Sequence, residues 1–140
     1  MIHKLPIRVY YEDTDAGGVV YHANHLKFGE RGRTEFLRAT GFENSKLNKD
    51  LGLIFVVRHI EIDYLKTAHL DDRLSMETSI SELKNTSFTM HQALFHVDTY
   101  GNLLEQVSDM KVTLVCVDTQ SYKPLRIPEK VKEAFQNFTE

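Results

Sequence analysis

Several features that mark specialised classes of protein are scarce or missing in this chain. Its one cysteine, Cys116, cannot form an internal disulfide, and its place in the apolar run 112–117 predicts a core residue rather than a nucleophile. No apolar run approaches the ~20 residues that cross a membrane, and residues 1–6 lack the apolar stretch of a signal peptide. We therefore expect a cytoplasmic protein with no integral membrane segment.

The chain also lacks a large excess of either positive or negative charge. The formal net charge is -3 and the lysines and arginines are scattered, which argues against a surface dedicated to nucleic acid. The hydrophobic share of 41% and the charged share of 26% are ordinary for a globular protein. At 140 residues the chain has room for one core, so a single domain is expected over 1–140.

The order of periodic segments predicts an α+β fold. A β-prone stretch at 7–11 precedes a turn-rich loop, and a helix is expected at about 24–39, where Gly41 is placed to end it. A short second helix is expected at 43–51, before Gly52. The later segments alternate apolar and polar residues as strands do, or repeat at helical spacing at the end of the chain. Strands are expected at 59–64, 74–80, 88–97 and 103–117, the last with a bulge near Ser108, and a final helix carries Val131 and Phe135.

This order indicates an antiparallel sheet that curls over one helix. Gly29 and Gly32 lie three residues apart inside that helix, and each costs roughly 1 kcal/mol relative to alanine. Such glycines are expected where another backbone presses close to the helix. A loosely packed or kinked helix is the alternative.

The chemistry of the chain is concentrated between residues 12 and 24. Three acids, Glu12, Asp13 and Asp15, precede the pair Gly17-Gly18, and Tyr21, His22 and Asn24 follow at the start of the predicted helix. A carboxylate beside a helix N-terminus suits acyl transfer, because free backbone N–H groups can polarise a carbonyl oxygen. Turn-forming acids, a glycine corner and an N-cap would give the same pattern for structural reasons. A metal site at His22 and His25 lacks a firm third ligand, so we expect no metal and no cofactor.

The segment 9–24 resembles the signature of the hotdog-fold 4-hydroxybenzoyl-CoA thioesterase family, most closely its YbgC-type acyl-CoA thioesterase branch. It contains Tyr11-Glu12-Asp13-Thr14-Asp15-Ala16-Gly17-Gly18, and the resemblance continues at 28–35, 55–58, 70–72 and 111–118. It implies a curled antiparallel sheet of about five strands around a long central helix. It also implies a homo-oligomer, either a dimer or a dimer of dimers (homotetramer), with active sites at the subunit boundary.

By this resemblance the protein is an enzyme that hydrolyses an acyl-CoA thioester to a carboxylic acid and coenzyme A. Asp15 is then the catalytic carboxylate, as nucleophile or as general base, and His22 assists, with its backbone N–H polarising the thioester carbonyl. The resemblance also implies a set of substrate-binding residues: Gly17, Gly18, Tyr21, Asn24, Val57 and Arg58. Val57 and Arg58 belong to a segment that could come from the partner subunit.

The sequence departs from the family pattern at the helix. His25 replaces an aromatic residue, and Gly29 and Gly32 replace a phenylalanine and an alanine, which predicts a larger acyl pocket or a looser helix.

Two alternatives stay open. A second enzymatic interpretation places the carboxylate on the helix, at Glu30 or Glu35. An interpretation of another class is a protein that binds acyl carrier protein or lipid-synthesis enzymes and has weak thioesterase activity.

Overall fold

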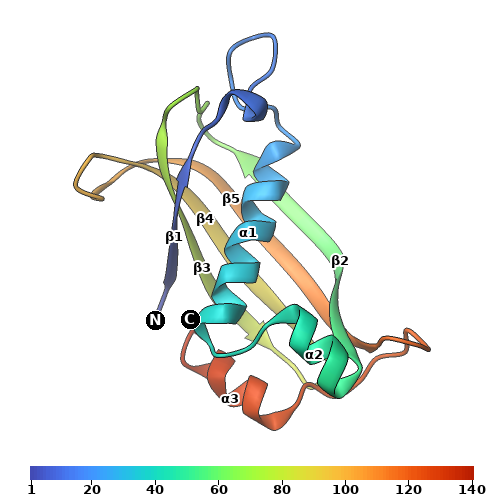
Figure 1. Cartoon of the computed structure of the whole chain (residues 1–140). Coiled ribbons are helices and arrows are strands. Elements are labelled where there is room, and N and C mark those ends of the chain that lie inside the picture. Colours follow the sequence, from blue (N-terminus) through green and yellow to red (C-terminus); the bar gives the residue numbers. More distant parts are fainter.

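The computed structural model describes all 140 residues, as an antiparallel sheet that curves around one long helix (Figure 1). The sheet has five strands in the order β1-β3-β4-β5-β2. These are β1 (His3–Arg8), β2 (Leu53–Tyr64), β3 (Arg73–Leu83), β4 (Ser87–Val97) and β5 (Leu103–Asp118). The helices are α1 (Asn24–Ala39), α2 (Asn44–Leu51) and α3 (Glu129–Gln136), and η1 (Tyr11–Asp13) is a 3₁₀ turn. The predicted α+β class and the expected hotdog arrangement are confirmed.

The two edges of the sheet differ in length and character. β1 is short and contains Pro6, whereas β2 is twelve residues long and pairs only with β5. A register shift between Val57 and His59 makes Arg58 the extra residue of a bulge in β2. β5 also shifts register against β4 around Val107, beside the predicted bulge.

The first predicted strand was misplaced by several residues. β1 ends at Arg8, because the Asp13 side chain accepts a hydrogen bond from the Tyr10 N–H and the chain closes into η1 instead of continuing as a strand. The helix ends were predicted well. Gly41 (φ +95°) follows α1, and Gly52 (φ +64°) ends α2 in the left-handed conformation that glycine adopts most easily.

The glycines of α1 bring the helix close to the sheet. A Cβ at Gly29 would lie 2.7 Å from Met110 Cε, and one at Gly32 would lie 2.7 Å from Met76 Cγ. The fully buried Gln92 fastens the two layers by donating to the Gly29 carbonyl at 2.9 Å. The glycines are therefore close-approach positions, but the atoms that press against them belong to side chains and not, as predicted, to another backbone. The space that larger residues would fill is occupied by these side chains, so the predicted enlargement of the pocket at this place was wrong.

Two hydrophobic clusters fill the concave side of the sheet. The larger lies under the C-terminal half of α1, with Phe36 and Phe135 as wholly or almost wholly buried members. The smaller contains Val20, Phe28 and Leu74 and lies under the loop that precedes α1. Burial of a side chain such as Phe28 stabilises the fold by about 1.5–3 kcal/mol, so the smaller cluster gives the loop a firm base.

A polar cluster fixes the end of the chain to the sheet. His91 Nε2 lies 2.6 Å from Asp109 Oδ1, its Nδ1 lies 2.9 Å from Glu140 Oε1, and Ser79 donates to that same glutamate oxygen at 2.7 Å. Burial opposes a charge on His91, but the hydrogen bonds that its ring donates to both carboxylates raise its pKa above the ordinary value. No helix of the structure is both long and apolar enough to cross a membrane.

Candidate active site

Asp13 and Asp15 are two residues apart and have opposite environments. Asp13 is only 3% exposed, and its carboxylate accepts hydrogen bonds from the Tyr10 N–H at 2.8 Å and the Asn24 side-chain amide at 3.1 Å. Asp15 is exposed, and its carboxylate accepts one hydrogen bond, from the Gly17 N–H to Oδ1 at 2.8 Å. Asp13 is thus committed to holding the loop, whereas Oδ2 of Asp15 is free.

The loop that carries Asp15 is a tight hairpin. The Asp15 N–H donates to the Val19 carbonyl at 2.9 Å, and the Gly18 N–H donates back to the Asp15 carbonyl at 3.0 Å. Gly18 has φ +81°, a conformation that costs other residues about 1–2 kcal/mol. Beside the carboxylate is a shallow depression of about 510 Å³, whose lining includes Tyr11, Thr14 and Leu70.

Two consecutive backbone amides are free at the start of α1. The Tyr21 carbonyl accepts the Asn24 N–H at 2.8 Å, and the His22 carbonyl accepts the His25 N–H at 3.3 Å. The N–H groups of Asn24 and His25 are therefore already used within the first turn of the helix. The amides of His22 and Ala23 donate to no acceptor in the protein. They lie at the positive end of the helix dipole and can therefore bind an oxyanion.

Aromatic side chains surround this helix start. The His22 ring lies between Tyr21 and Tyr64, with centroid distances of 4.5 and 6.4 Å. His25 is buried and meets Tyr64 edge-on at 5.1 Å. Burial, followed by the nearby His22, lowers the pKa of His25, so this imidazole stays neutral at pH 7.

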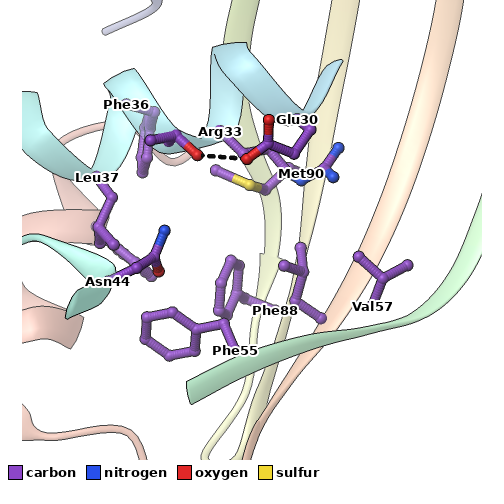
Figure 2. Close-up of a pocket in the computed structure, with 12 residues that line it drawn as sticks. Glu30, Arg33, Phe36, Leu37, Asn44, Phe55, Val57, Phe88 and Met90 are labelled. Carbon is purple, nitrogen blue, oxygen red and sulfur yellow. Dashed lines mark hydrogen bonds between the residues drawn. The ribbon is translucent and has the colours of Figure 1, made fainter. Parts of the chain in front are cut away.

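A second hollow lies between α1, α2 and β2 (Figure 2). Its volume is about 180 Å³, and eight of its twelve lining residues are hydrophobic, four of them phenylalanines. Phe55 and Phe88 meet edge-on at 5.2 Å, and the half-exposed Val57 lines the hollow from β2. Arg33 and Glu30 close the hollow at the helix. None of its lining residues is shared with the depression beside Asp15.

The structure therefore divides the expected site residues into groups. Asp15, Gly17 and Gly18 share one loop, and Tyr21 and His22 lie where that loop enters α1. Asn24 is turned inward, where its side-chain amide donates to Asp13, and it lines neither hollow. Val57 lines the second hollow only, and Arg58 is exposed on the bulge of β2.

Each carboxylate of the alternative interpretation has one oxygen hydrogen-bonded and one free, as Asp15 has. Glu30 accepts the Thr34 hydroxyl at 2.8 Å, and Glu35 pairs with Arg38. No group of three or more His, Cys, Asp or Glu side chains is placed to hold a metal ion.

Sequence reasoning overlooked three contributors to this region. Leu70 reaches the depression beside Asp15, Tyr64 contacts His22, and Gln92 ties α1 to the sheet. Leu70 falls in a segment with family resemblance, but nothing local marks it as a neighbour of the loop. Tyr64 simply ends an alternating strand.

A curled antiparallel sheet around one long helix is the architecture of a hotdog thioesterase. The sequence model of the Thioesterase-like superfamily matches residues 9–135, and the chain belongs to this superfamily. A curated relative from Haemophilus influenzae, "Acyl-CoA thioesterase YbgC", is 46% identical over 134 residues, which cover 96% of this chain and 94% of the relative.

Solved structures of thioesterases share this fold. A probable thioesterase from Bartonella henselae superposes with a TM-score of 0.83 at 40% identity and covers 91% of this chain and 100% of that one. A 4-hydroxybenzoyl CoA thioesterase mutant complexed with 4-hydroxybenzoyl CoA has a TM-score of 0.87 over 96% of this chain and 98% of its own. Its identity is 17%, so it supports the fold alone.

Proposed function

We propose that the protein hydrolyses acyl-CoA thioesters to a free carboxylic acid and coenzyme A, with Asp15 as the catalytic carboxylate. The observation that carries this proposal is the contrast between the two aspartates: Asp13 is buried and doubly hydrogen-bonded, whereas Asp15 keeps a free oxygen. The free amides of His22 and Ala23 follow on the same loop and supply donors for the carbonyl oxygen of the thioester.

Two routes use the same groups. As general base, Asp15 takes a proton from water while the water oxygen bonds to the carbonyl carbon, and coenzyme A leaves as the thiolate. As nucleophile, Asp15 attacks the carbonyl, expels the thiolate and forms a mixed anhydride, which water then hydrolyses. One single turnover in oxygen-18 water separates them, because only the nucleophilic route leaves the label in the Asp15 carboxylate.

The decisive experiment measures thiol release from acyl-CoAs of increasing chain length by the wild type and by Asp15→Asn. We expect release by the wild type with at least part of the series. For Asp15→Asn we expect a loss of about 10²-fold or more, typical of removing an essential base, with CoA binding retained. A variant that keeps most of the activity would sink the assignment of Asp15. A wild type silent with every chain would favour the alternative, a protein that binds acyl carrier protein.

We further propose that the enzyme is a homo-oligomer in which β2 pairs with β2 of a second copy. The free edge of β2 is long and carries the half-exposed Val57 and Tyr64, and edges of this kind tend to pair. The hollow at Phe55 holds about 180 Å³, less than the ~300 Å³ at which ligand pockets usually begin, and a second subunit across β2 would enlarge it. In this arrangement Val57 and Arg58 reach the substrate from the subunit boundary. Sedimentation velocity tests this pairing, and a monomer at assay concentrations would contradict it.

We also propose a cytoplasmic location, which cell fractionation can check.

A further inference from the structure

Tyr64 makes a contact with the helix start that hydrolysis by itself does not explain. Its hydroxyl donates to the His22 carbonyl at 2.9 Å, across 42 residues of sequence. Its ring meets those of His22 and His25 nearly at right angles, with interplanar angles of 89° and 83°. The last residue of β2 is thereby fixed to the peptide that enters α1.

The peptide that receives this hydrogen bond is also a donor. The His22 carbonyl and the Ala23 N–H belong to one peptide group, and the Ala23 N–H has no acceptor in the protein. A hydrogen bond to the carbonyl of a peptide polarises it and makes its N–H a stronger donor. The neighbouring peptide is arranged in the same way, since the Tyr21 carbonyl accepts the Asn24 N–H and the His22 N–H is free.

We propose that Tyr64 is a positioning residue for a two-donor oxyanion hole, made by the N–H groups of His22 and Ala23. Its hydroxyl holds the peptide between these residues in place and strengthens the Ala23 N–H. Tyr64 does not touch the thioester itself. The neutral, buried His25 packs edge-on against the Tyr64 ring. This inference rests on the proposed thioesterase function and adds a residue and a donor to it.

The kinetic test is Tyr64→Phe, which removes the hydroxyl and keeps the ring. Loss of a whole oxyanion donor costs about 10²–10³-fold in kcat, and Tyr64 acts through one donor, so we expect kcat to fall about tenfold with KM nearly unchanged. The matched control is Tyr100→Phe, because the Tyr100 side chain is 90% exposed on the β4–β5 turn and should leave both constants alone. A Tyr64→Phe enzyme with wild-type kcat would overturn the proposal.

A spectroscopic test separates positioning from a general effect on stability. In the Asp15→Asn background, which should retain substrate, the carbonyl stretch of bound ¹³C-labelled acyl-CoA should move to higher frequency when Tyr64→Phe is added. An unchanged frequency would overturn the proposal. Without substrate, the Ala23 amide proton should shift upfield in Tyr64→Phe, and an unmoved resonance would contradict the contact.

A further substitution guards against a Tyr64→Phe chain that fails to fold. Difluorotyrosine placed at position 64 keeps the shape of the ring and, at a pH low enough to keep its more acidic hydroxyl protonated, makes that hydroxyl a stronger donor, so the carbonyl stretch should move to lower frequency. A shift in the other direction, or none, would overturn the proposal. The two levels stay distinct: a wild type without any thiol release contradicts the proposed function, whereas an active wild type matched by Tyr64→Phe contradicts the role of Tyr64 alone.

Discussion

Removing the charge of Asp13 and removing that of Asp15 should affect stability differently. Replacing Asp13 by asparagine weakens its hydrogen bonds with Tyr10 and Asn24 inside the loop. We expect Asp13→Asn to lower the free energy of unfolding by about 1–3 kcal/mol, as loss of a buried hydrogen-bonding group does. Asp15→Asn should leave stability within about 0.5 kcal/mol, as exposed substitutions usually do. Urea unfolding of both variants measures the contrast, and equal destabilisation would contradict the division of roles.

Gly17 helps to orient the Asp15 carboxylate, because its N–H donates to Oδ1. A Cβ at Gly17 would lie 3.2 Å from Asp15 Oδ1, close enough to displace it. We expect Gly17→Ala to lower kcat by about tenfold to a hundredfold, since small misplacements of a reacting group have effects of this size. Gly101→Ala is the control, because its methyl would meet nothing within 4 Å and the strain that alanine brings at φ +84° stays within the β4–β5 turn. Equal kcat for the two variants would show that the contact is unimportant.

The helix α1 packs against the sheet at Gly29 and Gly32. We expect a methyl group added at these two positions to have different effects on stability. At Gly32 an added methyl would meet Met76 Cγ at 2.7 Å and Gln92 Nε2 at 2.9 Å, and this amide is fixed by its own hydrogen bonds. At Gly29 the nearest atom is the flexible end of Met110, again at 2.7 Å. We expect Gly32→Ala to cost about 1–3 kcal/mol of stability by overpacking. Gly29→Ala should be nearly neutral, because Met110 can move and alanine favours the helix by roughly 1 kcal/mol. Thermal unfolding ranks the two variants, and the reverse order would contradict this packing.

The same elements show what the sequence could predict. Helical periodicity and Gly41 are local signals, and they placed α1 correctly from Asn24 to Ala39. β1 was misplaced because the Asp13 side chain competes for the Tyr10 N–H, and β propensity does not register that competition. At the site, family resemblance selected Asp15 from three nearby acids. The contact of Tyr64 with His22 joins distant segments, and no local pattern signals it.

At the scale of the whole molecule, the cluster of His91, Asp109 and Glu140 makes stability depend on pH. His91 has a raised pKa in the folded chain, so its contribution is complete below the unfolded value of ~6.5 and is lost as pH rises through the folded value. Glu140 has a lowered pKa, mainly because Ser79 donates to it, so its contribution is lost as pH falls. The stability difference between wild type and His91→Gln should therefore shrink as pH rises from about 6.5 through the raised folded-state pKa of His91. A difference that is constant over this range would contradict the cluster's role.

Unfolding of the whole chain tests both the single domain and the proposed pairing through β2. If residues 1–140 form one domain, urea should unfold them in one transition that circular dichroism and tyrosine fluorescence report alike. If two copies pair, the midpoint should rise with protein concentration, because association stabilises the folded state by mass action. Two separate transitions would contradict the single domain, and a midpoint independent of concentration would contradict the pairing.

Cys116 has a practical consequence for all of these measurements. It is wholly buried on β5, and burial raises the pKa of its thiol to about 11, so little thiolate forms at neutral pH. A colorimetric thiol reagent added to the folded enzyme should therefore report released coenzyme A against an almost silent protein background. A cysteine introduced at an exposed position such as Tyr122 would be the one reactive thiol, and a single fluorophore could be attached there without removing Cys116 from the core.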